Sequence, residues 1–217
     1  MPSATPIADE VDQKKTAAPP SALGTVFATA RQAKIDTWVG DIAELGTRFP
    51  EGDLLTATGE PTTFTRAAGG GPAVVIFYRG AWCPYCNIAL RIYNAELAGP
   101  LAERGIALMA ISPQAPDGSL TTREKNELDF TVLSDPGNQI GRALGIRNIA
   151  TEQELATNVQ TGLDLTRVNA DGSTDLVMPT VAVVDAGGVL RFIDVHVDYT
   201  TRTEPAAILS AVEQLRP

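Results

Sequence analysis

AVVIFYRGAWCPYC, residues 73–86, decides the fold of this chain. Its apolar first half predicts a buried strand over 73–78, and the periodicity that follows the turn at 79–82 predicts a helix from about 83 to 104. The point where strand gives way to helix holds both cysteines of the 217-residue chain, Cys83 and Cys86. Two thiols three positions apart at such a junction predict thiol–disulfide chemistry.

The physics of a helix start explains this prediction. The first free backbone N–H groups and the positive end of the helix dipole favour a thiolate, which makes Cys83 the nucleophile on this argument. Pro84 suits the first helical turn because its missing N–H would have been unpaired anyway. Cys86 lies one turn further on, so one cysteine can attack a substrate while the other resolves the adduct. The prediction requires the two sulfur atoms to be close together and within reach of solvent.

Other uses of the cysteines fit the sequence less well. A structural disulfide would close a very short loop and stabilise the fold little. Structural zinc needs four Cys or His ligands, and the single histidine, His196, is distant in sequence and shares a strand face with Asp194 and Asp198, so we interpret it as a solvated or hydrogen-bonded side chain. Arg79, four residues before Cys83, either adds positive charge near the sulfur atoms or is a surface residue.

The composition limits the classes of partner. A net charge of −9 and a pI of about 4.6 argue against nucleic acid and anionic membranes, which need a basic patch. No segment has the length and apolarity of a membrane span, and residues 1–20 lack the pattern of a secretory signal. We therefore expect a cytoplasmic protein with no membrane partner, no metal and no cofactor.

The rest of the chain predicts one α/β domain with N-terminal additions. We predict a disordered tail over 1–20, a helical extension over 21–50 and a domain over 51–217. The apolar stripe of the extension would pack on the core or on a partner subunit, so a homodimer stays open. Further predictions are a hairpin over 54–65, a helix broken or kinked at Pro100, a strand over 106–111, a helix over 118–128, a strand over 130–133, a helix over 134–144 capped by Asp135, a loop or insertion over 146–174, a strand over 176–184, a return strand over 189–197 and a last helix from about 203. This order predicts a mixed sheet with helices on both faces.

Four segments together resemble the peroxiredoxin (alkyl hydroperoxide reductase / thiol-specific antioxidant) family, in its branch with a C-x-x-C site. They are Phe77–Asn87, Ile111–Pro113, Phe130–Pro136 with Ala143–Ile146, and Met178–Asp185. The resemblance covers roughly residues 50–217 and implies a thioredoxin-like fold.

The family pattern also implies roles for residues at the site. Cys86 falls on the peroxidatic position, Cys83 on the family's Thr, and Arg79 on its proline. The family's late arginine, just before a Thr, is replaced by Met178-Pro179 ahead of Thr180, as in thioredoxins. Trp82, Pro84 and Tyr85 complete the matched segment as supporting residues, and Pro179 would be either a cis proline beside the cysteines or an ordinary trans one.

Three functions remain open. The resemblance implies a thiol-dependent peroxidase that reduces hydrogen peroxide or organic hydroperoxides through Cys83 and Cys86, recycled by a thioredoxin- or glutaredoxin-type reductant. The tetrapeptide C-P-Y-C together with Met178-Pro179 favours a thiol–disulfide oxidoreductase that acts on protein or small-molecule disulfides. The third reading is a non-enzymatic redox sensor, with the N-terminal helical segment available to a partner.

Overall fold

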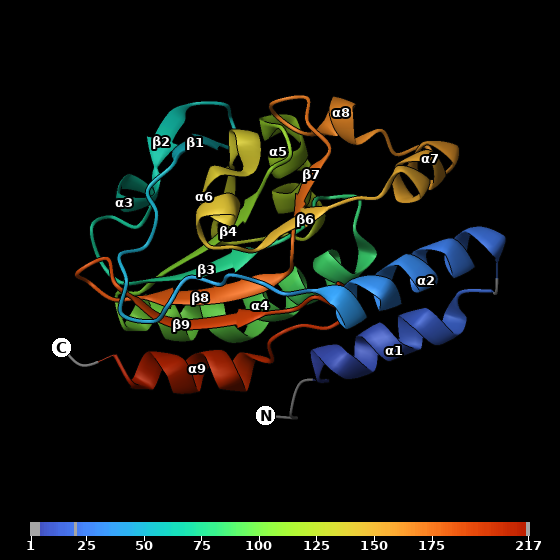
Figure 1. The fold of residues 1–217 in the computed structure, drawn as a ribbon. Helices are drawn as coiled ribbons and strands as arrows, with labels where there is room; N and C mark the ends of the chain where they lie inside the picture. Colours follow the sequence, from blue (N-terminus) through green and yellow to red (C-terminus); the bar gives the residue numbers. More distant parts are fainter. Residues whose placement is uncertain (1–4, 20, 216–217) are drawn as a thin grey trace.

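The centre of the molecule is a seven-stranded mixed sheet (Figure 1). The computed structural model describes residues 5–19 and 21–215. In chain order the strands are β1 (Asp53–Thr56), β2 (Pro61–Thr63), β3 (Ala73–Phe77), β4 (Ala107–Ser112), β5 (Thr131–Ser134), β8 (Thr180–Val184) and β9 (Leu190–Val195). Across the sheet they lie in the order β2-β1-β5-β4-β3-β8-β9. The prediction of a mixed sheet with helices on both faces is confirmed.

The strand that leads to the cysteines is central in this sheet. β3 pairs in parallel with β4 on one side and antiparallel with β8 on the other, so that Phe77 lies beside both Ile111 and Thr180. All five residues of β3 are apolar and all five are buried. An apolar run without alternation is what a strand covered on both faces requires.

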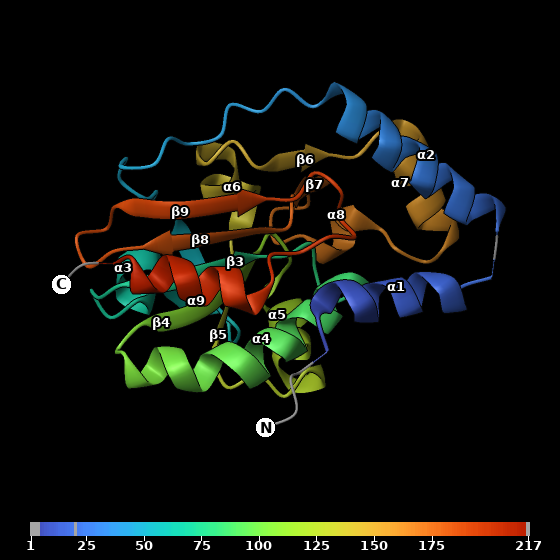
Figure 2. The same ribbon diagram turned by 90° about the horizontal axis from the view of Figure 1, so that it is seen from below.

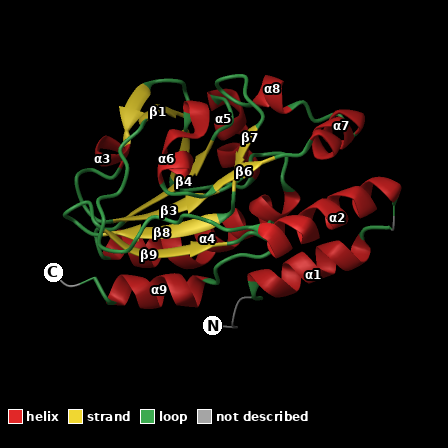
Figure 3. Cartoon of the chain, viewed as in Figure 1, coloured by secondary structure: helices red, strands yellow, loops and turns green. Residues whose placement is uncertain are grey.

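Helices cover both faces (Figures 2 and 3). Side chains of α1, α4 and α9 share one apolar cluster with Val74 and Ile76, and α3 and α6 contribute to a second cluster with Val75 and Phe77. The helices are α1 (Ile7–Ala17), α2 (Ala22–Thr37), α3 (Phe64–Ala67), α4 (Pro84–Glu103), α5 (Pro116–Lys125), α6 (Gln139–Ala143), α7 (Glu152–Gln160), α8 (Leu165–Val168) and α9 (Pro205–Glu213). No described helix has the length and apolarity that crossing a membrane would need.

Several predicted elements have different boundaries. Pro100 does not interrupt α4, which continues to Glu103. The helix predicted over 134–144 is divided, because Gly137 and Asn138 have positive φ angles and separate a short 3-10 turn from α6. The N-cap position of α6 is Asn138 and not Asp135, which precedes the 3-10 turn. The carboxylate of Asp135 nevertheless satisfies the start of α6, since it accepts hydrogen bonds from the backbone N–H groups of Gln139 and Ile140, each at 2.9 Å.

The segment 146–174, predicted to be a loop or an insertion, contains regular structure. It holds α7 and α8, and β6 (Arg147–Ile149) pairs antiparallel with β7 (Asp175–Val177) in a second sheet. The Thr151 hydroxyl accepts from the backbone of Glu154, whose side chain accepts in return from the Thr151 backbone, so α7 starts with a capping box. The predicted strand over 176–184 is likewise divided at Met178-Pro179 between β7 and β8.

The tail predicted over 1–20 is wrong for its central part. Residues 1–4 and 20 lie outside the described residues, but Ile7–Ala17 forms α1. Ile7 and Val11 are one turn apart on its inner face and are buried in the cluster with α4. The Glu204 carboxylate accepts from the backbone N–H groups of Ile7 at 3.1 Å and Ala8 at 3.0 Å. The two buried side chains and the distant Glu204 carboxylate thus stabilise α1, although its sequence has no local pattern that predicts a helix.

The predicted extension over 21–50 is helical only in its first part. Ser21 caps α2 by accepting from the Gly24 N–H, and near its other end Lys34 forms an ion pair of 2.8 Å with Glu154 of α7. The segment from 38 to 52 is irregular and hydrogen-bonds to the sheet side, for example from the Gly46 N–H to the Leu190 carbonyl at 2.8 Å. Its division from the 51–217 domain stays a prediction.

We expect the variant Glu204→Ala to loosen α1 without disturbing α9. The Glu204 side chain makes no capping hydrogen bond to its own helix, so the loss falls on the first two N–H groups of α1. The cost should be about 1 kcal/mol, as for the loss of a helix cap. Amide hydrogen exchange should show faster exchange over residues 7–17, and Glu213→Gln, on the exposed side of α9, serves as the control. Unchanged exchange in α1 would contradict this role.

Candidate active site

The two cysteines meet at the start of α4, as their spacing predicts. Cys83 is the N-cap residue of α4, Cys86 lies in its first turn, and their Sγ atoms are 2.8 Å apart. Both residues are 1% exposed. The hydrogen bond between the two sulfur atoms needs a proton on at least one of them, so both cannot be thiolates at once.

The turn before the cysteines is held from two sides. The Ala81 N–H donates to Oε1 of Gln114 at 2.8 Å, and Nδ2 of Asn87 donates to the Ala81 carbonyl at 2.9 Å. Gly80 has a φ of 150°, and a Cβ at this position would lie 2.4 Å from Nε1 of Trp82. The turn therefore requires glycine, because the indole ring of Trp82 packs directly over it.

An arginine that the sequence analysis did not single out contacts Cys86. Arg202 lies in the loop between β9 and α9, 116 positions further along the chain, and its Nη2 donates to Cys86 Sγ at 3.0 Å. Its Nη1 donates to the Tyr199 carbonyl at 2.7 Å, which fixes the direction of the guanidinium. No local pattern marks Arg202, because its contact depends on how the sheet brings the loop 196–204 to α4.

The single histidine braces this loop. His196 Nδ1 is 2.7 Å from the Thr201 hydroxyl, while Nε2 is 3.3 Å from the Thr203 hydroxyl and 3.2 Å from the Asp194 carboxylate. Thr201 and Thr203 flank Arg202 in sequence. The interpretation of His196 as a hydrogen-bonded side chain is confirmed, and burial lowers its pKa.

The surroundings give the two cysteines opposite acidities. Burial alone would raise the pKa of Cys86, but the Cys83 hydrogen bond and the charge of Arg202 outweigh it and lower that pKa to about 5. Burial and the negative charge of Cys86 raise the pKa of Cys83 well above its usual value. These directions favour Cys86 over Cys83 as the thiolate of the pair. Helix-start reasoning favours Cys83 instead, and it does not include the Cys83–Cys86 hydrogen bond or the guanidinium of Arg202 at the second sulfur.

Arg79 is buried between two aromatic rings and is not a surface residue. It is 8% exposed, and its guanidinium carbon lies 4.8 Å from the ring centroid of Trp82 and 4.2 Å from that of Tyr199. Its Nε has no hydrogen-bond partner within the part of the chain that the structure describes. Stacking on π faces holds the cation in place while leaving its N–H groups free to bind an acceptor.

A cavity of about 520 Å³ opens onto Cys83. Its lining brings together five of the residues that the sequence singled out, whereas Cys86 is not among the lining residues. α2 and α7 form the far walls and lie at the same end of the molecule (Figures 1 and 2). The lining residues are Gly24, Phe27, Ala28, Arg31, Arg79, Trp82, Cys83, Pro84, Tyr85, Asn158, Thr161, Gly162, Leu163 and Tyr199. The cavity thus borders residue Cys83, while both cysteines are almost completely buried, and access of solvent to the two sulfur atoms stays a prediction.

Pro179 and Thr180 lie outside this cavity. Thr180 occupies the sheet position beside Phe77, and its hydroxyl donates to the Met178 carbonyl at 2.9 Å. The Met178–Pro179 peptide bond is trans. A supporting role for these two residues stays a prediction.

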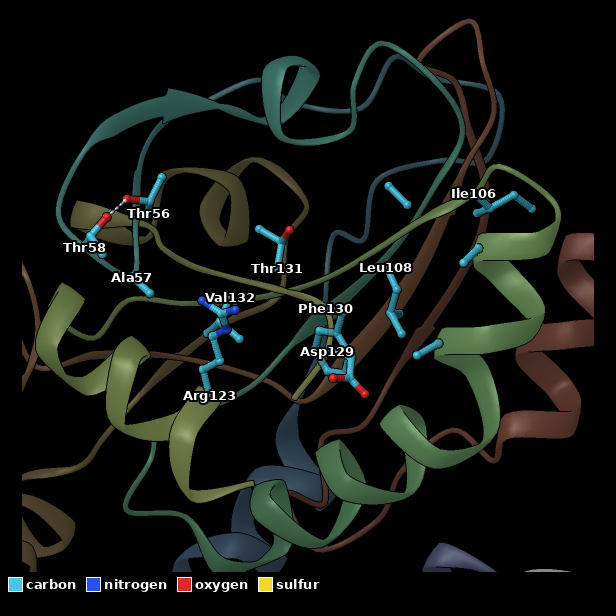
Figure 4. Close-up of a pocket in the computed structure, with 13 residues that line it drawn as sticks. Thr56, Ala57, Thr58, Ile106, Leu108, Arg123, Asp129, Phe130, Thr131 and Val132 are labelled. Carbon is cyan, nitrogen blue, oxygen red and sulfur yellow. Dashed lines mark hydrogen bonds between the residues drawn. The ribbon is translucent and has the colours of Figure 1, made fainter. Parts of the chain in front are cut away.

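A second cavity, shown in Figure 4, is separate from the cysteines. It measures about 450 Å³ and lies between the C-terminal half of α4 and strands β4 and β5, with Arg123 and Asp129 among its polar residues. Its lining includes neither cysteine and none of the predicted site residues. Within residues 5–19 and 21–215, no group of three His, Cys, Asp or Glu side chains is placed to hold a metal ion.

Comparison with known proteins identifies the family. Residues 45–193 match the model of the AhpC/TSA family, and this segment includes β3, both cysteines and β8. The chain belongs to the AhpC/TSA family. The match ends before Arg202 and begins after α2, so this guanidinium and one wall of the Cys83 cavity lie outside the matched segment.

Individual relatives agree with this assignment. A curated protein of Haemophilus influenzae named as a peroxiredoxin, bcp, is 35% identical over 80 residues, which are 36% of this chain and 49% of that protein. The chain thus spans about half the length of this relative. The crystal structure of peroxidoxin BcpB from Mycobacterium tuberculosis matches with a TM-score of 0.61 at 19% identity, over 80% of this chain and 99% of that one. A peroxiredoxin-like protein from Aquifex aeolicus matches with a TM-score of 0.61 at 18% identity, over 82% and 91%. At these identities the two structures show a shared fold.

We expect Arg202→Met to raise the pKa of Cys86 by about 1 to 3 pH units, the usual effect of losing an adjacent opposite charge. The pH dependence of iodoacetamide alkylation, followed by mass spectrometry of the Cys86 peptide, measures this pKa directly. Arg66→Gln removes an exposed charge from α3 and should leave the profile unchanged. A Cys86 pKa that stays at its original value in Arg202→Met would show that the guanidinium does not hold the thiolate.

Proposed function

We propose that this protein is a thiol-dependent peroxidase in which Cys86 attacks hydrogen peroxide or an organic hydroperoxide. The observation that carries the proposal is the pair of contacts to one sulfur atom: Cys86 Sγ accepts from Arg202 at 3.0 Å and lies 2.8 Å from Cys83 Sγ. Membership of the AhpC/TSA family supports the same assignment. We also propose a reducing compartment such as the cytoplasm as its location, where the two cysteines would be kept as thiols between turnovers.

The first step oxidises Cys86. The thiolate attacks one oxygen of the peroxide, the O–O bond breaks, and the second oxygen leaves as water or an alcohol after it takes up a proton. Cys86 becomes a sulfenic acid. The positive charges of Arg202 and Arg79 favour both the thiolate before the step and the negative charge that develops on the leaving oxygen during it.

The second step uses the neighbouring thiol. Cys83 Sγ attacks the Cys86 sulfenic sulfur, the S–O bond breaks, and water leaves as the disulfide forms. The separation of 2.8 Å means that little backbone movement is needed before the sulfur atoms bond. A thioredoxin- or glutaredoxin-type dithiol would then return the disulfide to two thiols.

The departures from the family pattern support this division of roles. Cys83 stands where the family has Thr, and it offers Cys86 an S–H donor in place of a hydroxyl. The family's late arginine is replaced by Met178-Pro179, and Arg202 supplies a guanidinium from the loop before α9. A guanidinium thus contacts the Cys86 sulfur as the family pattern requires, although it belongs to a different part of the chain.

Thiol–disulfide exchange is the second candidate, and one observation favours it. Residue Cys83 and not Cys86 lines the cavity, so a disulfide substrate bound there would lie nearer to Cys83. The high pKa of Cys83 opposes this function, because the attacking group in exchange is a thiolate.

Single cysteine variants separate the two functions. Cys86→Ser should reduce peroxide consumption to the background rate, since it removes the thiolate. Cys83→Ser should consume about one equivalent of peroxide per protein and stop, because a sulfenic acid forms on Cys86 and is not resolved. Stopped-flow peroxide assays and dimedone trapping with mass spectrometry measure both outcomes.

Opposite results would favour the second candidate. Peroxide consumption that survives in Cys86→Ser, or a parent protein that consumes none with any dithiol, removes the peroxidase assignment. Insulin reduction that is lost in Cys83→Ser would then assign thiol–disulfide exchange.

A further inference from the structure

We propose that the Cys83 cavity binds a low-molecular-weight thiol that carries carboxylates, and that this thiol reduces the Cys83–Cys86 disulfide by attack on Cys83. The inference rests on the proposed function and adds a small thiol to the reductants of the same disulfide. It rests on which sulfur the cavity reaches, on the cations in its wall and on its size.

The cavity discriminates between the two sulfur atoms. Cys83 is in its lining and Cys86 is not, whereas the peroxide step belongs to Cys86. A ligand large enough to fill the cavity is therefore placed for the recycling step.

The charges in the wall favour an anion. Arg79 is buried without an ion-pair partner among the described side chains, and its Nε lacks any acceptor there. Arg31 of α2 adds a second guanidinium, which lies 5.7 Å from the Tyr199 ring and 3.5 Å from the single carboxylate in contact with it, that of Asp198. Two arginines against one carboxylate leave an excess of positive charge. Because a guanidinium pairs with a carboxylate through two hydrogen bonds, Arg79 is ready to bind an acid group.

The other lining groups suit the rest of such a molecule. Trp82, Tyr85 and Phe27 give apolar contact, and Asn158 and Thr161 offer neutral hydrogen-bonding groups like those that hold peptide bonds. A volume of about 520 Å³ accommodates a small molecule.

Reduction of the Cys83–Cys86 disulfide takes two successive attacks by ligand thiolates. The ligand thiolate attacks Cys83 Sγ, the Cys83–Cys86 bond breaks, and Cys86 leaves with the electron pair as a thiolate beside Arg202. Of the two sulfur atoms Cys86 is the better leaving group because its thiol is the more acidic. A second ligand thiolate attacks the ligand sulfur of the mixed disulfide, and Cys83 leaves and takes up a proton. Two small thiols are oxidised to one small disulfide, and the protein regains both thiols.

The test compares glutathione with its diethyl ester, which carries the same thiol without its two carboxylates. The protein is oxidised to the disulfide with diamide, so the experiment does not require peroxidase activity, and rates are compared at equal thiolate concentration. We expect reduction by glutathione to be at least tenfold faster than reduction by the ester. Arg31→Gln and Arg79→Gln should each bring that ratio towards one, whereas Arg66→Gln, on exposed α3, should keep it.

The site of attack is tested separately. Glutathione disulfide should modify Cys83 in Cys86→Ser, and mass spectrometry should find the mixed disulfide on that residue. Equal rates for glutathione and its ester, reduction by thioredoxin alone, or attack at Cys86 in quenched samples of the parent would each overturn the proposal. A protein that shows the glutathione preference but consumes no peroxide would keep this inference and remove the proposed function.

Discussion

The contact between the Arg202 guanidinium and Cys86 Sγ determines the chemistry of the whole site. Two buried sulfur atoms 2.8 Å apart cannot both be charged, so the guanidinium in direct contact with Cys86 favours the proton on Cys83. The helix dipole alone would favour the sulfur at the N-cap. A guanidinium at 3.0 Å is stronger than that dipole, because a full charge in direct contact exceeds the partial charge of a helix end.

Much of the surrounding structure keeps this cation in place. His196 holds Thr201 and Thr203 on either side of Arg202, and the Tyr93 hydroxyl donates to the Thr203 carbonyl at 2.7 Å, which ties the same loop to α4. A buried charge is costly without a partner, so thiolate and guanidinium depend on each other. The fold places the loop 196–204 against α4, and the low pKa of Cys86 follows from this contact between distant parts of the chain.

The sequence predicted what local patterns encode. The apolar run 73–77, the cysteine spacing and the Asp135 cap each act over a few residues, and β3, the paired sulfur atoms and the start of α6 agree with them. The role of Arg202 could not be predicted from the sequence, because its contact with Cys86 joins residues that are 116 positions apart. The burial of Arg79 also involves a distant residue, Tyr199, whose ring packs on its guanidinium. The position of α1 likewise depends on its hydrogen bonds to the distant Glu204 carboxylate. The errors over 1–20 and 146–174 arose in the same way, since two buried anchors in a polar helix and a capping box in a weakly periodic segment give little signal.

The link between Glu204 and the first turn of α1 has a practical consequence for anyone who shortens or tags this protein. Glu204 stands two positions from Arg202, and its carboxylate is occupied by the N–H groups of Ile7 and Ala8. Trimming the chain before residue 21 would remove both of these hydrogen bonds together with the buried side chains of Ile7 and Val11. Recombinant versions that differ in this segment therefore differ in how the amino end packs against α4 and α9, and measurements of stability made on one version do not transfer to another.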